Sequence, residues 1–279
     1  MKNILLSLVT LLCFASSTTA QEHKFFKETN YRKKNISLSW GYNRSSYSKS
    51  NLTLKGDNYN FVIENMIADD AQTPFDWGVY FTPVSLSIPQ YNFNIGYYID
   101  NHWSISFNVD HMKYVMRQDQ TALIDGYINE PNNFYNGTYV HQPVVLTSDF
   151  LTFEHTDGLN YLNIEVSYTQ DIYSSTKQNF IVEAIGGAAA GISLPKTNAK
   201  LFNYPRHDDF HVAGFGLSSR VGLNFVFYKH FFIQTNLKGA WINMPDIIIR
   251  SNSNDRAKQN FFFGEVEGLF GVMYPIKKK

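Results

Sequence analysis

The feature that most limits what this chain can fold into is a repeated alternation of apolar and polar residues with a period of two. Successive side chains of a strand point to opposite faces of a sheet, so such a segment predicts a strand with one apolar and one polar face. Eight segments show the pattern, at about residues 36–43, 91–99, 103–110, 162–169, 180–184, 217–227, 233–238 and 265–274. After residue 20 no run reaches the roughly 18 to 20 apolar residues of a membrane-spanning helix. The sequence therefore predicts an all-β protein.

The composition of the two faces favours a barrel in a membrane over a soluble sandwich. The polar faces carry mainly Ser, Asn, Gly and Gln, and only 17% of the chain is charged, against roughly 25% in ordinary soluble domains. Aromatic residues gather near the ends of the apolar faces, as in the girdles of outer-membrane barrels. One predicted girdle consists of Trp103, Tyr173, Phe180, Phe227, Phe231 and Tyr274, and the other of Trp40, Tyr91, Trp241 and Phe262.

The lengths of the connections predict the topology. Short turns at residues 100–101, 174–178 and 229–230 alternate with long connections at residues 45–87, 117–148, 195–209 and 244–258. Outer-membrane barrels alternate short periplasmic turns with long outer loops in this way. We therefore predict an eight-stranded antiparallel up-and-down transmembrane β-barrel with long extracellular loops and both termini in the periplasm. Residues 52–63 predict a hairpin in the first loop, and ten strands result if that hairpin enters the wall.

The N-terminus has the features of a secretory signal peptide. Lys2 precedes an apolar stretch at residues 4–15, and small residues end at Ala20. We expect a signal peptide at 1–20, a short periplasmic segment at 21–34, the barrel at 35–276 and a basic tail at 277–279. The single cysteine, Cys13, lies in the predicted signal peptide, so the exported chain is expected to have no disulfide. With 24 basic and 24 acidic residues, nothing in the charge indicates nucleic-acid binding.

From about residue 35 to 276, the chain resembles the small Gram-negative outer-membrane β-barrel proteins typified by OmpA, OmpX and the PagL-type lipid A deacylases. The resemblance rests on architecture and the signal peptide, not on a diagnostic motif. It implies a location in the cell outer membrane, contact with membrane lipid and lipopolysaccharide, and assembly by the β-barrel insertion machinery. Family members usually end on an aromatic residue, whereas here Tyr274 is followed by Pro275, Ile276 and three lysines.

Charged residues on the polar faces predict a network inside the barrel. We estimate the height of each charged residue by counting positions from the short-turn rim of its strand, at about 3.3 Å per residue. By this count, six of the seven inward charges fall in one layer and Glu183 lies lower. Lys238 is then next to Arg220 on one side and to the glutamates of the last strand on the other. Isolated buried charges are expensive, so we expect them to pair and to plug the narrow interior. The predicted network consists of Asp110, Glu165, Glu183, Arg220, Lys238, Glu265 and Glu267.

Few residues suggest catalysis. The stretch Glu154, His155, Thr156 and Asp157 faintly resembles the His-x-Ser patch of the lipid A deacylases, with Asp157 where the family has its serine nucleophile. Thr156 points to the opposite face of a strand from His155. On straight strands His111 and His155 lie about 26 Å apart. No acidic cluster matches a metal-binding signature, and we predict neither a metal nor a cofactor.

Two functional classes follow, together with a weaker third. The first is a non-enzymatic barrel with a charge-plugged lumen, whose long loops serve envelope integrity or bind a surface ligand. Its best binding aromatics are Tyr127, Phe134, Tyr135 and Tyr139. The second is a lipid-modifying enzyme that works through His155 and its neighbours. The third is a small-solute porin, which requires a wider barrel.

Overall fold

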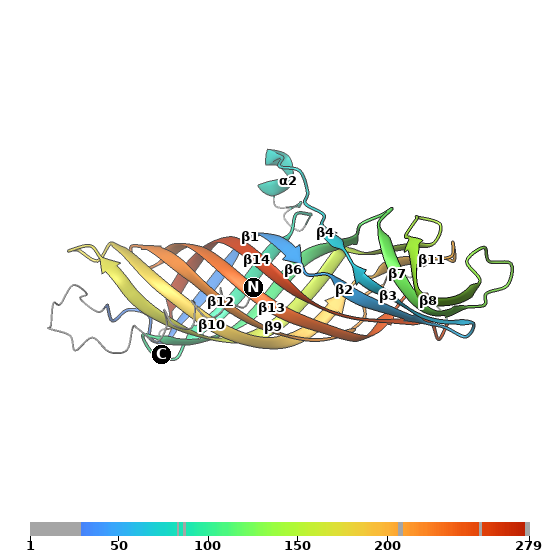
Figure 1. The fold of residues 1–279 in the computed structure, drawn as a ribbon. Coiled ribbons are helices and arrows are strands. Elements are labelled where there is room, and N and C mark those ends of the chain that lie inside the picture. Colours follow the sequence, from blue (N-terminus) through green and yellow to red (C-terminus); the bar gives the residue numbers. More distant parts are fainter. Residues whose placement is uncertain (1–28, 83, 86–87, 206–208, 251–252, 277–279) are drawn as a thin grey trace.

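The computed structural model describes residues 29–82, 84–85, 88–205, 209–250 and 253–276, and these form an elongated, almost wholly antiparallel β structure (Figure 1). The predicted signal peptide at 1–20 and the basic tail at 277–279 lie outside the described residues. Among the described residues, no helix is long and apolar enough to span a membrane. The largest part of the structure is a closed barrel.

Eight strands form the ring of the barrel, and each pairs antiparallel with both neighbours. The ring closes where β1 pairs with β14, from Asn35 opposite Pro275 to Tyr47 opposite Phe263. Each of the eight predicted segments lies on one of these strands, so the eight-stranded prediction is confirmed. In ring order the strands are β1 (Asn35–Tyr47), β5 (Tyr91–Tyr98), β6 (Trp103–Met116), β9 (Leu151–Ser174), β10 (Phe180–Pro195), β12 (Gly214–Phe227), β13 (Phe231–Ile248) and β14 (Arg256–Pro275).

Three short turns lie at one end of the barrel, which we call the proximal end. They join β5 to β6, β9 to β10 and β12 to β13, as the sequence predicts. The C-terminal end of β14 lies at the same end, because Pro275 pairs with Asn35 at the start of β1. The opposite end is called distal.

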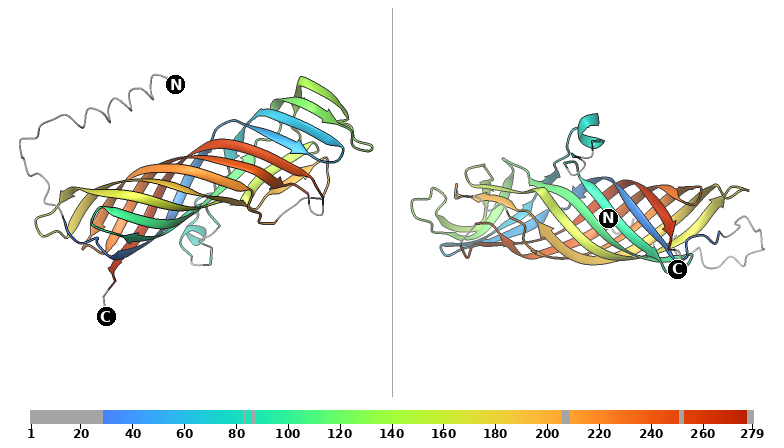
Figure 2. Two further views of the ribbon diagram at one scale, coloured as in Figure 1. Left: turned by 90° about the horizontal axis from the view of Figure 1, so that it is seen from below. Right: turned by 180° about the vertical axis from the view of Figure 1, so that it is seen from behind.

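Much of the sequence that was predicted as long loops forms strands at the distal end (Figure 2). The distal sheet consists of β2 (Ser50–Lys55), β3 (Tyr59–Met66), β7 (Thr121–Ile128) and β8 (Gly137–Val145), and it continues from the distal end of β14. The short strands β4 (Ala68–Asp70) and β11 (Asn198–Leu201) pair with β6 and β9.

The structure excludes the ten-stranded alternative and corrects one prediction about these connections. The hairpin predicted at residues 52–63 is formed by β2 and β3, and it does not enter the ring, because β14 pairs with β2 only beyond the point where its pairing with β1 ends. The fourth connection, predicted at 244–258, is short, since β13 continues to Ile248 and β14 begins at Arg256. The strands extend past the predicted barrel because the distal end has an apolar interior of its own to cover.

The polarity of the barrel strands reverses along their length. On the proximal part of β13, Leu237 faces outward and is 60% exposed, whereas Lys238 faces inward and is buried. Farther along the same inward face, Ala240 and Ile242 are buried and apolar. The reversal occurs at one level on neighbouring strands, because Lys238 pairs with Glu265 and Ala240 pairs with Phe263 of β14. The proximal part is thus mainly polar inside, apart from a small apolar cluster of Ile181, Val226 and Phe232, and apolar outside, whereas the distal part is apolar inside.

The apolar interior of the distal part is a continuous core, here called the distal core. It joins the inward faces of the extended barrel strands to the distal sheet. Burial of aromatic and aliphatic side chains is the main stabilising contribution of such a cluster. The largest of its fully buried side chains are Tyr59, Phe61, Tyr114, Phe150, Phe153, Tyr161 and Phe261.

Candidate functional site

Lys238 lies at the centre of a cluster of charges in the barrel interior, just below the distal core. Its Nζ is 2.8 Å from Oδ1 of Asp110 and 2.5 Å from Oε1 of Glu267, and it is 3.8 Å from Oε2 of Glu265. Glu265 and Glu267 come from β14, which neighbours β13, whereas Asp110 comes from β6 on another part of the ring. All four side chains are buried. We call them the lysine cluster.

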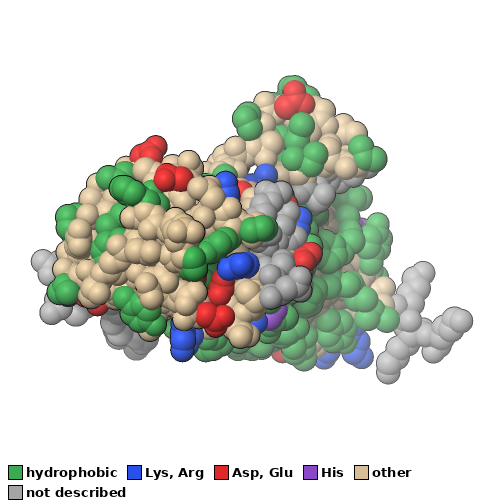
Figure 3. Space-filling model, turned by 90° about the vertical axis from the view of Figure 1, so that its right-hand side faces the viewer, with side chains coloured by type: hydrophobic (Ala, Val, Ile, Leu, Met, Phe, Trp, Pro, Cys, Tyr) green, Lys and Arg blue, Asp and Glu red, His purple; other side chains and the backbone are tan. Residues whose placement is uncertain are grey.

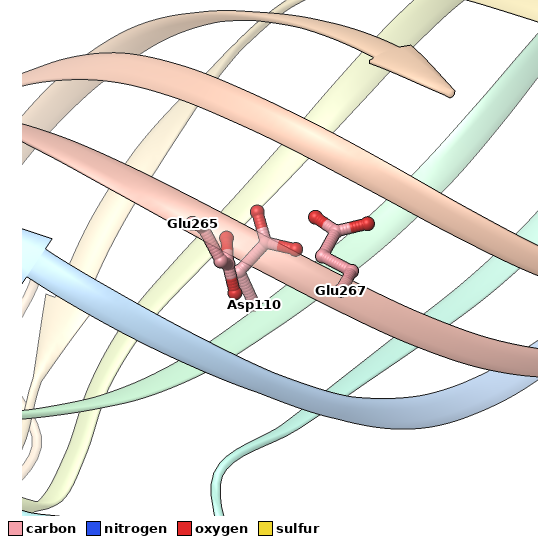
Figure 4. A group of neighbouring side chains, drawn as sticks. All are labelled: Asp110, Glu265 and Glu267. Atoms are coloured by element: carbon pink, nitrogen blue, oxygen red, sulfur yellow. The ribbon is translucent and has the colours of Figure 1, made fainter.

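The three carboxylates of the lysine cluster lie close enough together to hold a metal ion (Figure 4). However, each of the three carboxylates already accepts a hydrogen bond from the protein, and of their oxygens only Oε2 of Glu265 has no hydrogen-bond partner among the described residues. Asn92 Nδ2 donates to Asp110 at 2.7 Å and to Glu265 at 3.1 Å, and Asn236 Nδ2 donates to Glu267 at 2.6 Å. The ammonium of Lys238 supplies the positive charge that a metal would otherwise bring. The geometry therefore fits an internal ion-pair network.

Arg220 and Glu165 form a second pair in the interior. Arg220 donates to Oε1 of Glu165 from Nη2 at 2.6 Å and from Nε at 2.9 Å. Glu165 also accepts from Ser167 Oγ at 2.9 Å. Gly187 leaves the space that this carboxylate fills, because a Cβ at Gly187 would lie 2.8 Å from it. Gly187 thus has a packing role on β10, because it lets the Glu165 side chain approach the strand closely.

A third cluster closes the proximal mouth, and sequence reasoning missed most of it. Arg32, in the segment before β1, is fully buried and pairs with Asp171 at 2.6 Å and with Glu183. Tyr31 donates from its hydroxyl to Glu183, and Thr29 donates to Asp171 from both its backbone N–H and its hydroxyl. We call Arg32, Asp171 and Glu183 the proximal cluster. The sequence signal for a missing cation was that the predicted network contains five carboxylates but only two cations.

The prediction that six charges share one layer is only partly right. Arg220, Lys238 and Glu265 are level by direct pairing across β12, β13 and β14. Asp110, however, pairs with Tyr161 of β9, four positions away from Glu165. Counting from the rim assumes that all strands start at one height, whereas the strands of a barrel are tilted and staggered. β9 continues to Ser174 although Trp103, the first residue of β6, pairs with Tyr168.

The same stagger makes the predicted separation of two histidines wrong. His155 pairs with Tyr114 of β6, only three residues from His111. The two rings nevertheless have different surroundings. His111 is stacked on Tyr91 and bonded through Nδ1 to Oδ1 of Asn160 at 2.8 Å, whereas His155 faces the distal core.

The candidate catalytic residues on β9 do not assemble into a reactive site. His155 is fully buried beside Tyr114 and Phe153, and its Nδ1 is 3.1 Å from Thr197 Oγ1. Glu154 and Thr156 alternate with it and lie on the opposite face of the strand. Asp157 forms an ion pair with Lys196 at 2.9 Å. A general base must reach its nucleophile and a substrate, and these side chains do not offer that arrangement.

The burial of His155 leads to a testable pH dependence. Burial lowers the pKa of His155 to about 3, from its ordinary value of 6.5. The unfolded chain therefore binds a proton between these two pH values that the folded chain does not bind, so stability falls as pH falls below about 6.5. The expected loss is about 1.4 kcal/mol per pH unit. Denaturant unfolding in detergent micelles at pH 7 and pH 5 would measure it.

The matched control for this pH dependence is His155→Gln, which keeps a polar partner for Thr197 but does not titrate. The difference in unfolding free energy between pH 7 and pH 5 should be smaller in this variant than in the parent. An equal pH dependence in both proteins would contradict a buried, neutral His155.

No protein-family model and no curated protein matches the sequence. Among solved structures, the chain is similar to the outer membrane protein OprG from Pseudomonas aeruginosa, with a TM-score of 0.39 and 10% identity over 88% of this chain and 98% of that chain. It is also similar to Neisserial surface protein A, with a TM-score of 0.36 and 11% identity over 88% and 99% of the two chains. A third is Ail, the attachment invasion locus protein of Yersinia pestis, with a TM-score of 0.32 and 12% identity over 87% and 99%. These are outer-membrane β-barrel proteins, the architecture that the sequence resembles, and at such low scores we draw nothing about function from them.

Proposed function

We propose that this protein is an outer-membrane β-barrel that is closed to solutes and carries a folded platform at the cell surface, without enzymatic activity. The reversal of polarity along the barrel strands carries the proposal. The outward apolar side chains of the proximal part form a band around the barrel, here called the apolar belt, in which Val221 is 62% exposed, Leu237 60% and Phe270 59%. Exposure of such a large apolar surface to water is unfavourable. A bilayer favours the same belt, and the distal part, with its apolar interior, suits an aqueous environment.

The filled interior supports a closed barrel. Eight strands enclose a space only wide enough for side chains. Here the proximal cluster, the Arg220–Glu165 pair and the lysine cluster follow one another along the interior, and the distal core lies beyond them. A small-solute porin requires a continuous aqueous path, which these layers would interrupt.

The distal part offers surfaces for contact with lipopolysaccharide or a surface ligand. Its tip has a polar pocket of about 630 Å³, where the β2–β3 turn meets three other connections. Three carboxylates, from Asp57, Glu130 and Asp255, line it together with Arg250 and Tyr204. Of the aromatics expected to bind a ligand, Phe134 and Tyr127 are exposed, whereas Tyr135 and Tyr139 pack against the distal core. Figure 3 shows this end of the molecule face on.

Cell fractionation and planar-bilayer recording test this function together. We expect the protein in the outer-membrane fraction, with faster gel migration before heating than after, because a closed barrel resists unfolding by detergent. We expect no steady channel current from the purified protein. Recovery as a soluble periplasmic protein would overturn the membrane assignment, and a steady current would overturn the closed interior.

A charge placed on the apolar belt should destabilise the protein in lipid. Leu237→Arg puts a cation on the outward face of β13, and we expect it to cost about 2 to 4 kcal/mol of unfolding free energy in bilayers. The control is Phe134→Arg, at a distal residue that is 92% exposed, where little change is expected. Equal stability of both variants in lipid vesicles would show that Leu237 does not face the bilayer.

A further inference from the structure

One segment projects sideways from the barrel rather than from its distal tip. Residues 71–90 connect β4 to β5 and contain the one-turn helix α2 (Trp77–Tyr80), which stands out from the wall in Figure 1. Its surface is unusually apolar for an exposed connection, and Figure 3 shows hydrophobic side chains on the projection. The exposed fractions are 61% for Phe75, 71% for Trp77, 55% for Phe81, 91% for Val84 and 50% for Ile88.

Ring contacts hold these aromatics in one group. Phe75 and Trp77 meet edge to face with their centroids 5.3 Å apart, and Trp77 stacks on Phe81 at 5.1 Å. Phe75 also contacts Tyr80, which is buried at the base of the projection. The group is therefore a defined apolar surface of the fold, which we call the lateral patch.

Tyr80 fixes the lateral patch to the outer wall of the barrel. Its ring lies 4.8 Å from that of Tyr42, and the Tyr42 hydroxyl donates to the backbone carbonyl of Tyr80. Tyr42 in turn contacts Trp40 at 4.5 Å. Both are outward residues of β1, on the same face as Ile36 and Leu38. The patch is thus attached directly to the distal end of the apolar belt.

Two basic residues lie beside the lateral patch on β1 and β6, where Asp70 accepts a hydrogen bond from the Ser45 backbone. Arg44 is the next outward residue of β1 after Tyr42, and its guanidinium donates to the Tyr80 hydroxyl at 3.4 Å. Lys113, on β6, donates from Nζ to Thr73 Oγ1 at 3.0 Å. Apolar side chains with cations directly beside them suit the boundary between acyl chains and anionic headgroups.

We propose that the lateral patch is a membrane anchor that inserts into the headgroup–acyl boundary of the leaflet around the distal rim of the barrel. The inference rests on the proposed function, since it requires the apolar belt to lie in a bilayer. The occupant is lipid because the patch continues the belt at Tyr42. A surface for a protein partner would be expected on the distal tip, away from the lipid.

Fluorophores attached to single cysteines test the anchor. Because Cys13 is the only natural cysteine, a Cys13→Ser background accepts one new cysteine at Val84, at Leu237 or at Phe134. Each protein is labelled with bimane and placed, one copy per disc, in nanodiscs of phosphatidylcholine brominated on its acyl chains. We expect a loss of fluorescence at Val84 comparable with the loss at Leu237, and little loss at Phe134.

The three labels separate failure of the anchor from failure of the proposed function. Quenching at Leu237 without quenching at Val84 would overturn the anchor while leaving the barrel in the bilayer. The same result is expected if the lateral patch binds a protein partner in the cell, so that outcome also overturns the anchor. No quenching at Leu237 would overturn the membrane assignment itself. As a further check, Trp77→Ser with Phe81→Ser should reduce the quenching at Val84 and leave that at Leu237 unchanged.

Discussion

Replacing Lys238 with alanine is expected to lower the free energy of unfolding by about 3 to 5 kcal/mol, because it leaves buried carboxylates without their cation. The ammonium contacts Asp110 and Glu267 directly, and all three side chains lie in the interior. Asp110 and Glu267 are buried, so water does not replace the missing ammonium where these carboxylates lie. Denaturant unfolding of the detergent-folded protein, followed by tryptophan fluorescence, would measure the change.

Lys55→Ala is the matched control for Lys238→Ala, since Lys55 is an exposed lysine at the end of β2. Its removal should change the unfolding free energy by less than about 0.5 kcal/mol. The double variant Lys238→Ala with Glu267→Gln should be less destabilised than the sum of the single variants. In the double variant, the Glu267 carboxylate that loses its cation has itself been replaced by a neutral amide. If Lys238→Ala were as stable as Lys55→Ala, the lysine cluster would not hold the interior together.

Arg32→Ala is expected to have an effect of similar size, about 3 to 5 kcal/mol, although Arg32 lies outside the barrel strands. Its guanidinium is the cation that Asp171 and Glu183 contact in the proximal mouth, and it is fully buried. Without it, residues 29–34 lose their ion pairs to β9 and β10 and keep only the hydrogen bonds of Thr29 and Tyr31 to these strands. Proteolysis near the N-terminus should become faster, and denaturant unfolding should begin at a lower concentration.

Lys33→Ala is the control for Arg32→Ala, because Lys33 is the adjacent residue and is exposed. Planar-bilayer recording adds a second readout. Arg32→Ala removes one of the layers that fill the interior but leaves the lysine cluster and the distal core, so we expect no steady current. A stable Arg32→Ala protein, or one as resistant to proteolysis as Lys33→Ala, would show that the N-terminal segment is not held by this ion pair.

The local properties of the chain were predictable because strand alternation depends only on neighbouring residues. On β13, the sequence alone places Ile233 and Leu237 on one face and Lys238 on the other, and the structure has them on the outer and inner faces of the barrel. The three short turns follow from the same pattern, because each interrupts two alternating segments. The pair between Lys238 and the glutamates of β14 could also be predicted from the sequence, because β13 and β14 follow one another in the chain and pair as neighbours.

Contacts between distant parts of the chain were decided by tertiary structure. Asp110 reaches Lys238 across the interior, and the stagger of the closed ring, which a count along single strands does not contain, determines where it lies. His155 is a buried neighbour of the distal core for the same reason. Arg32 enters the proximal mouth only because the ring leaves two carboxylates there.

The sequence by itself therefore determined the eight alternating segments of the ring and which of their charged side chains face inward, because these depend on a period of two and on short connections. Only the tertiary structure decided that the β2–β3 hairpin extends β14 instead of widening the ring, and that α2 projects from the wall beside Tyr42. The physical reason is that ring closure and burial of the distal core involve all the strands at once. Their outcome depends on the sum of many contacts between residues far apart in the chain.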